Sequence, residues 1–412
     1  MDQNNRLLLR NAAIVDAASP EPRAGMHVLI EGDTIREVSD RPIAAPNAPS
    51  IDLAGRSLLP GFIDAHVHAI AVTTDLAGLA RIPPYLVAAQ AKDVLEGMLA
   101  RGFTTVRDAG GAEWGLAEAV RLGHFRGPRM FVAGMALAQT GGQGDFRQRE
   151  EMYLGCPCCR ATRSLCRIVD GVDEVRKAVR EELRKGADQI KVMAAGGMVS
   201  RVPIHRPHFS MDELEAMVDE AGRADSYVMA HAYESVAIRR CVEAGVRSIE
   251  HGNLIDDATA RLMQERGTYM VPTMTVYEGY HRHADELGFS PKVKAQFAEL
   301  QKHAVTGLDK VRSAGVKIGH GSDLEGILHQ YQSREFALKA QVMMPWEVIV
   351  SATETNAEMM GQKGRIGIVA PGAMADLVVV DGNPLTDLGL LGGQGERLPL
   401  IMKGGEIVKN AL

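Results

Sequence analysis

The sequence predicts an α/β fold, a (β/α)8 TIM barrel with a small β-sandwich domain built from both chain ends. A chain of 412 residues is too long for one ordinary hydrophobic core unless one domain is a barrel of about 250 residues. Buried apolar strands alternate with amphipathic helices through eight units in the middle, which favours a closed parallel barrel over an open sheet. We place the β-sandwich at 1–58 and 362–412, and the catalytic barrel at 59–361.

The two ends of the chain share a pattern of short alternating strands. Near the start these are LLLRNAAIVDA and MHVLIEGDTIREVS, with a tight turn at Gly32 and Asp33. Near the other end they are ADLVVVDGNPL and LPLIMKGGEIVKN, with a hairpin turn at Gly404 and Gly405. Two β segments that flank a different middle predict one small domain assembled from both ends.

The middle of the chain supplies the strands and helices of the barrel. The predicted strands are GFIDAHVH, FTTVRDAG, RMFVAGMAL, DQIKVMAAGG, YVMAHAY, RSIEHG, TYMVPTM and VKIGHGSD. Helical patterns lie between them, and in SMDELEAMVDEAGRA the pair Ser210 and Glu213 predicts a capping box. A glycine follows the helix in RKG, EAG, ERG and SAG, which supports the unit boundaries.

Charge and hydropathy exclude several classes of partner. A net charge of -6, spread without long single-sign runs, gives no electrostatic footprint for nucleic acid or an anionic membrane. No apolar stretch approaches the roughly 20 residues of a membrane span, and the N-terminus resembles neither a signal peptide nor a transit peptide. We therefore expect a cytoplasmic protein with a small-molecule substrate, and we expect it to form a homo-oligomer.

Four of the five cysteines cluster in one segment. They are Cys156, Cys158, Cys159 and Cys166. Structural zinc sites usually have two residues between paired cysteines, but Cys158 and Cys159 are adjacent and this spacing is missing here. The spacing favours a structured loop with free thiols, reduced in the cytoplasm, over a structural zinc site.

Candidate metal ligands stand at the carboxyl ends of predicted strands, where barrels carry their catalytic groups. His66 and His68 are two residues apart on the first strand, so both side chains point to the same side. Three further strands end in His231, His251 and Asp323. A single such histidine is more often a core residue, but the convergence of five ligand-type residues on four strands predicts a metal site.

Lys191 lies midway along the apolar strand DQIKVMAAGG. An ammonium is costly to bury, so this lysine must be neutral or paired. A neutral amine can react with carbon dioxide to give a carbamate, an anion that can bridge two metals. The alternative is a lysine that is salt-bridged to a barrel carboxylate.

Over essentially its whole length the sequence resembles the amidohydrolase superfamily, in LLPGFIDAHVH, FTTVRDAGG, SIEHGNLID, GHGSD and GAMADLVVVDGNP. RGFTTVRDAGG, ALAQTGG, the CPCC loop and HAY resemble its prolidase-type branch, which hydrolyses Xaa-Pro dipeptides or related N-acyl amino acids. The resemblance implies two metals, usually zinc. The first is held by His66 and His68 with carboxylated Lys191 and Asp323, and the second by His231 and His251.

The resemblance also implies a mechanism. A hydroxide bridging two metals is available at neutral pH, and Asp323 can take its proton and deliver it to the leaving amine. Tyr233 lies two residues beyond His231 and resembles the family tyrosine that binds the oxyanion or the substrate carboxylate. A purely structural tyrosine is the alternative.

Two features bear on the substrate. Gln143 stands after ALAQTGG, where this branch often has a histidine, and an amide can donate a hydrogen bond but carries no positive charge. The loop SRVPIHRPHF contains Arg201 and Arg206, with His205 and His208, and this cationic loop could attract a substrate carboxylate. The alternative is that these are solvated loop residues.

These features predict a metallo-dipeptidase-like amidohydrolase that cleaves dipeptides or N-acyl amino acids with a free carboxylate. Hydrolysis of an aromatic N-acyl amino acid such as a mycotoxin amide, of a carbamate, or of a cyclic amide is the alternative. The bridging Lys191 argues against a mononuclear deaminase, and the complete set of ligands argues against a non-catalytic scaffold protein.

Overall fold

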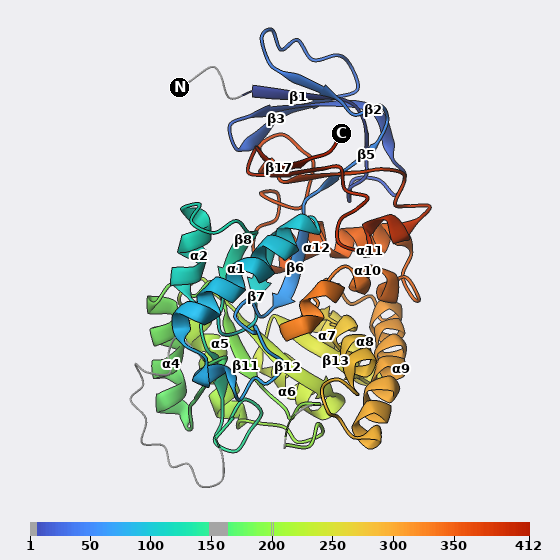
Figure 1. Cartoon of the computed structure of the whole chain (residues 1–412). Helices are drawn as coiled ribbons and strands as arrows, with labels where there is room; N and C mark the ends of the chain where they lie inside the picture. The colour runs from blue at the N-terminus through green and yellow to red at the C-terminus, as the bar shows by residue number, and fades with distance from the viewer. Residues whose placement is uncertain (1–5, 148–163, 199, 201) are drawn as a thin grey trace. The chain divides into compact units, whose positions relative to one another are not determined.

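The computed structural model describes residues 6–147, 164–198, 200 and 202–412 (Figure 1). The chain divides into two compact units. The first unit comprises Met1–Asp64, Gly97–Thr105 and Ser333–Leu412, and the second comprises Ala65–Glu96 and Val106–Gln332.

The first unit contains an eight-stranded sheet in the order β17-β16-β15-β5-β1-β2-β3, with β4 beside β1. β15 pairs antiparallel with β5, so strands from both chain ends join in one sheet. The bounds are β1 (Arg6–Ile14), β2 (Arg23–Glu31), β3 (Thr34–Ser39), β4 (Ser50–Asp52), β5 (Ser57–Pro60), β15 (Leu377–Val380), β16 (Leu400–Lys403) and β17 (Glu406–Asn410).

The core of this sheet is apolar. Leu9, Val28, Leu377 and Val379 are fully buried in one cluster with other aliphatic side chains of the same strands. The predicted hairpin turn between β16 and β17 is present, with positive φ at Gly404 and Gly405. A Cβ on Gly405 would lie 1.9 Å from the carbonyl oxygen of Gly32, so only glycine permits this close approach of two turns.

The strands of the central segment form two sheets. One has the order β6-β7-β8, and the other, parallel throughout, has the order β10-β9-β11-β12-β13-β14. The bounds are β6 (Phe62–Val67), β7 (Phe103–Asp108), β8 (Arg129–Val132), β9 (Ala136–Ala138), β10 (Cys166–Ile168), β11 (Ile190–Met193), β12 (Val228–Glu234), β13 (Ser248–Leu254) and β14 (Tyr269–Val271).

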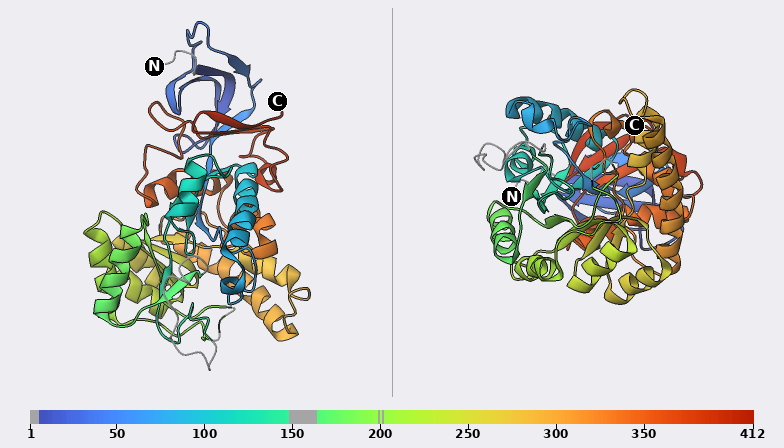
Figure 2. Two further views of the ribbon diagram at one scale, coloured as in Figure 1. Left: turned by 60° about the vertical axis from the view of Figure 1, so that its left-hand side comes forward. Right: turned by 90° about the horizontal axis from the view of Figure 1, so that it is seen from below.

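Helices alternate with these strands and lie outside them in the second unit (Figure 2). The capping box at Ser210 is confirmed, because its hydroxyl accepts from the amide of Glu213 and the Glu213 side chain accepts from the amide of Ser210. The bounds are α1 (Pro84–Ala100), α2 (Trp114–Arg121), α4 (Val172–Arg184), α5 (Met211–Gly222), α6 (Ser235–Ala244), α7 (Asp257–Arg266), α8 (Thr275–His283) and α9 (Pro291–Ser313), followed in the first unit by α10 (Arg334–Lys339), α11 (Pro345–Ser351) and α12 (Glu354–Met359). The 3-10 helices of the described ranges are η1 (Leu79–Arg81), η2 (Gly326–Tyr331) and η3 (Leu388–Leu391).

The predicted eighth strand, VKIGHGSD, is wrong as a strand. It makes one isolated bridge, between Ile318 and Met270. Its backbone bonds to two neighbours in turn: Gly319 donates to the carbonyl of Met270 at 2.7 Å, and Asp323 donates to that of His66 at 2.8 Å. These bonds and the single bridge do not make the continuous ladder that defines a strand. Among the described residues, the strands of the central segment form two sheets, and no ladder of paired strands joins these two sheets.

Candidate metal centre and catalytic pocket

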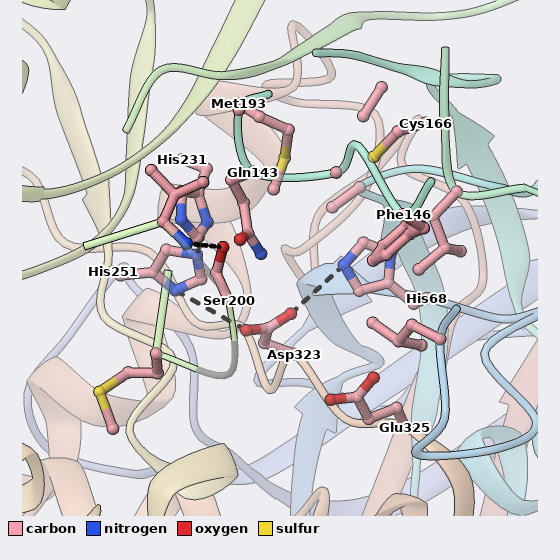
Figure 3. A pocket seen from close by; sticks show the side chains of 18 of the residues that line it. His68, Gln143, Phe146, Cys166, Met193, Ser200, His231, His251, Asp323 and Glu325 are labelled. Carbon is pink, nitrogen blue, oxygen red and sulfur yellow. Dashed lines mark hydrogen bonds and ion pairs between the residues drawn. The ribbon is translucent and has the colours of Figure 1, made fainter. Parts of the chain in front are cut away.

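A pocket of about 550 Å³ lies in the second unit, at the carboxyl ends of its strands. All six predicted metal ligands line it: His66, His68, Lys191, His231, His251 and Asp323. They come from β6, β11, β12, β13 and the segment after α9. The structure thus brings together side chains that lie far apart in the sequence (Figure 3).

Asp323 stands at the centre of this group. Its Oδ1 lies 3.2 Å from Nε2 of His66 and 3.3 Å from Nε2 of His68, and its Oδ2 lies 3.8 Å from Nδ1 of His251. Figure 3 shows the Asp323 carboxylate between His68 and His251. Potential ligand atoms of His66, His251 and Asp323 lie within 4.8 Å of one another, close enough for one cation to contact all three.

Each of the four histidines has one ring nitrogen bound to a group that fixes the ring. These contacts are His66 Nδ1 to Glu250 Oε2 (2.7 Å), His68 Nδ1 to the Gly110 carbonyl (2.8 Å), His231 Nε2 to the Gly196 carbonyl (3.2 Å) and His251 Nδ1 to Thr273 Oγ1 (2.7 Å). The remaining nitrogens of His231 and His251 lie 2.8 Å apart. Metal-binding histidines have this arrangement, in which the outer bond sets the orientation of the ring.

Protonation also suits a metal. Burial lowers the pKa of His231 to about 3 and holds that of His251 well below its usual value, so both rings are neutral, the form that binds metals. Burial raises the pKa of Asp323, but His66 and His68 outweigh burial and keep it well below its usual value. The neutral imidazoles of His231 and His251 and the ionised carboxylate of Asp323 are therefore donors that fit divalent cations.

Lys191 is 2% exposed, and its Nζ lies 3.4 Å from Nε2 of His66. Burial lowers the pKa of its amine, although Glu250 and Asp323 act in the opposite direction. In the described part of the chain Lys191 forms no ion pair, which counts against the salt-bridged alternative. A buried amine with a lowered pKa is the form that reacts with carbon dioxide.

A buried network that was not predicted from the sequence lies behind His66. Arg107 Nη2 donates to Glu250 Oε1 at 2.9 Å, and Ser248 Oγ donates to the same oxygen at 2.6 Å. Burial raises the pKa of Glu250, but Arg107 and His66 lower it to about 2. The available signal was a charged residue inside an apolar strand, in FTTVRDAG and RSIEHG, which is the argument that identified Lys191.

Strained backbone marks the same region. His251, Thr273 and Asp323 have φ values of 76°, 47° and 56°, in the left-handed region that residues other than glycine rarely adopt. Such outliers concentrate at functional sites, where the surrounding structure holds them in place.

Comparison with known proteins agrees with this geometry. The model of the amidohydrolase family matches residues 57–408. The chain belongs to the amidohydrolase family. Ochratoxinase from Aspergillus niger is 33% identical over 85% of this chain and 75% of its own length.

Two solved structures are also similar to this amidohydrolase. A prolidase complexed with N-methylphosphonate-L-proline has a TM-score of 0.95 and 46% identity, covering 98% of this chain and all of its own. A Xaa-Pro dipeptidase with bound methionine in its active site has a TM-score of 0.87 and 28% identity, with 98% and 100% covered. The protein is thus a hydrolase acting on amide bonds, in the prolidase-type branch of the amidohydrolases.

Two further predicted residues of this amidohydrolase, Tyr233 and Gln143, line the pocket. Tyr233 is 4% exposed and stacks on the His251 ring at 4.8 Å and 10°. Burial raises the pKa of its hydroxyl, which keeps the proton and can donate it in a hydrogen bond. A Cβ on Gly197 would lie 2.8 Å from the Gln143 side chain, so the glycine leaves room for this amide.

The cationic loop contributes one described arginine to the pocket. Arg206 is exposed and lines the pocket, whereas His205 and His208 do not. Arg201 lies outside the described residues. Arg147 also lines the pocket, but it forms a two-point ion pair with Asp145, at 2.7 and 2.6 Å.

The cysteine cluster is described only in part. Cys166 is a buried free thiol in β10 that lines the pocket, and burial raises its pKa to about 12. A thiol that keeps its proton is a poor metal ligand. Cys156, Cys158 and Cys159 lie outside the described residues.

No helix in the described ranges is long and apolar enough to span a membrane.

Proposed function

We propose that this amidohydrolase cleaves Xaa-Pro or other dipeptides, or N-acyl amino acids, that carry a free carboxylate. The observation that carries the proposal is one pocket lined by a metal-type ligand cluster and by Arg206, a cation without an ion pair among the described residues. The related prolidase, solved with a proline-based phosphonate, and the related Xaa-Pro dipeptidase support this substrate class.

The proposal includes two divalent metal ions, zinc, held by His66, His68, His231, His251 and Asp323, with Lys191 as a carboxylated bridging ligand. When bound, such ions polarise an amide carbonyl and make a water molecule nucleophilic at neutral pH. The outer partners of the histidines keep their rings aimed at the pocket.

Asp323 is the general acid and base in this proposal. It accepts the proton of the attacking water and passes it to the leaving amine, because its carboxylate sits among the predicted ligands. Tyr233 and Gln143 donate hydrogen bonds to the oxygen of the tetrahedral intermediate or to the substrate carboxylate. Arg206, together with Arg201, binds that carboxylate through two parallel hydrogen bonds.

We further propose that the strands of the catalytic domain, residues 59–361, close into a (β/α)8 barrel, and that residues 1–58 and 362–412 form a β-sandwich. Closure is supported by the backbone bonds that link the segment before Asp323 to Met270 on one side and to His66 on the other. A cytoplasmic homo-oligomer acting on a small molecule completes the proposal.

Paired substrates test the function. Amidating the carboxylate of a dipeptide such as Ala-Pro should lower kcat/KM by about 10- to 100-fold, or roughly 1.4 to 2.8 kcal/mol. Arg206→Ala should produce the same loss on the free acid and no further loss on the amide. Arg147→Ala is the matched control, since its charge is already paired, and it should keep the wild-type ratio. Equal cleavage of free and amidated substrates would reject the exopeptidase function.

A second candidate is the hydrolysis of an aromatic N-acyl amino acid such as a mycotoxin amide. The identity to ochratoxinase over most of the chain favours it. An N-aroyl-phenylalanine in the same panel separates the two functions: faster cleavage of it than of any dipeptide would favour this candidate.

A further inference from the structure

One buried acid in the pocket has no part in the mechanism above. Glu325 lines the pocket, is 7% exposed, and accepts a hydrogen bond from the hydroxyl of Tyr280. In the described part of the chain it forms no ion pair with any lysine, arginine or histidine. A buried carboxylate is costly in its charged form unless a cation accompanies it, and the ammonium group of a ligand would supply that cation.

The backbone holds Glu325 firmly at the wall. The amide of Gly326 donates to the carbonyl of Ala71 at 2.8 Å, and His329 Nε2 bonds to the same oxygen at 3.1 Å. Gly326 has φ +52°, and a Cβ there would lie 2.8 Å from the amide nitrogen of Thr74. The turn therefore packs tightly against the segment after β6, and the carboxyl group stays fixed.

The surroundings of Glu325 suit a cationic ligand. Tyr280 and Phe297 stack at 5.0 Å and line the same pocket, and aromatic rings favour a nearby ammonium. In Figure 3, Glu325 and Gln143 lie on opposite sides of Asp323 in the view. The lining of the pocket includes both an acid, Glu325, and a cation, Arg206, which suit the two charged ends of a dipeptide.

We propose that Glu325 binds the free α-ammonium group of the first residue of a dipeptide. The inference rests on the proposed function and narrows it, because it selects dipeptides over N-acylated amino acids, which lack this charge. Asp75, another acid of the pocket, is not equivalent: it is largely exposed and already paired with Arg81 at 3.1 Å. Glu325 is thus a specificity-determining residue.

The test compares Ala-Pro with N-acetyl-Ala-Pro, both with a free carboxylate. Glu325→Gln keeps the shape and the acceptor for Tyr280 but removes the charge. It should lower kcat/KM for Ala-Pro by about 10- to 100-fold, the range for losing a charged hydrogen bond. It should leave N-acetyl-Ala-Pro within about threefold of the wild type. Asp75→Asn is the matched control and should keep the wild-type preference.

Binding provides an independent readout. Calorimetry with L-alanine amide and N-acetyl-L-alanine amide should show tighter binding of the amine by the wild type, and Glu325→Gln should remove the difference. Equal losses on both substrates, or an unchanged amine preference, would overturn the role of Glu325 and leave the proposed function standing. If neither Ala-Pro nor its acetylated form is cleaved, the Xaa-Pro part of the proposed function fails, and the calorimetry alone then decides the inference.

Discussion

The terminal sheet and the pocket strands are buried to a similar degree, but the terminal sheet buries apolar side chains and the pocket strands bury polar ones as well. β15 is buried along its whole length and contains only leucine and valine. β13 is also buried over six of its seven residues, yet it contains Glu250, His251 and Asn253. Burying apolar groups stabilises a fold, whereas burying polar groups costs stability unless each finds a partner. The buried side chains of the terminal sheet therefore stabilise the fold, whereas the buried polar side chains of the pocket strands hold the candidate catalytic groups in position.

The polar residues of β13 are connected outward. Glu250 bonds to Arg107, and Asn253 accepts from the Tyr277 hydroxyl at 2.6 Å and donates to the Pro272 carbonyl at 3.1 Å. Removing one member of such a set leaves its partner buried and unpaired. We therefore expect substitutions in the pocket to change chemistry most and those in the terminal sheet to change stability most.

The largest expected effect is at Lys191. Lys191→Ala should abolish turnover, because the bridging anion is lost, and short carboxylic acids with bicarbonate should restore part of it. Lys339→Met is a matched control, since Lys339 is another fully buried lysine but lies in the first unit and donates to Ser351. Its kcat, measured on folded protein, should match the wild type. Wild-type turnover by Lys191→Ala would refute the carbamate.

Asp323→Asn should lower kcat by about 100-fold or more, the scale of a lost general acid and base, and leave the circular dichroism spectrum unchanged. The amide retains the size of the side chain but cannot accept the proton. Steady-state kinetics at saturating substrate measure this effect. A near-normal kcat would assign proton transfer to another group.

Leu377→Ala should have the opposite profile. Leu377 is fully buried in the terminal sheet, and truncating it should lower the free energy of unfolding by about 2 to 5 kcal/mol. Urea denaturation measures the loss, and kcat of the folded enzyme should stay within about twofold. A loss of kcat at unchanged stability would contradict the division between the two regions.

The smallest expected effect concerns an ion-pair network between α4 and α5. Hydrogen bonds from Arg180 and Arg176 lower the pKa of Glu220 from its usual 4.5 to about 2. The contribution of Glu220 to the free energy of unfolding is therefore complete above pH 4.5 and is lost as the pH falls toward 2. Glu220→Gln should lose about 1 kcal/mol of stability at pH 7 and progressively less in acid. A pH-independent difference would contradict this assignment.

Much of this could be predicted from the sequence, because the signals are local. The His66 and His68 spacing and the strand-end positions of His231 and His251 were sufficient to expect convergence on one pocket, and the structure brings these side chains together. The glycines that end helices were equally informative: Gly186, Gly245, Gly267 and Gly315 all have positive φ.

Other features depend on partners distant in the sequence. Arg107 and Glu250 are 143 residues apart, so no local pattern pairs them. The expected strand at VKIGHGSD is absent because only Ile318 in it forms a bridge, to the distant Met270, and a local pattern of apolar residues does not reveal this. Glu325 lies just before η2, outside any strand or helix, so no periodic pattern in the sequence predicts that it is buried in the pocket.

The most direct test of the central claim is metal content measured together with activity. Elemental analysis of the purified enzyme should find about two divalent ions per chain. Chelation should abolish turnover, and adding zinc back should restore it in proportion to the second equivalent bound. Full activity with a single ion per chain, or undiminished activity after complete chelation, would contradict the account.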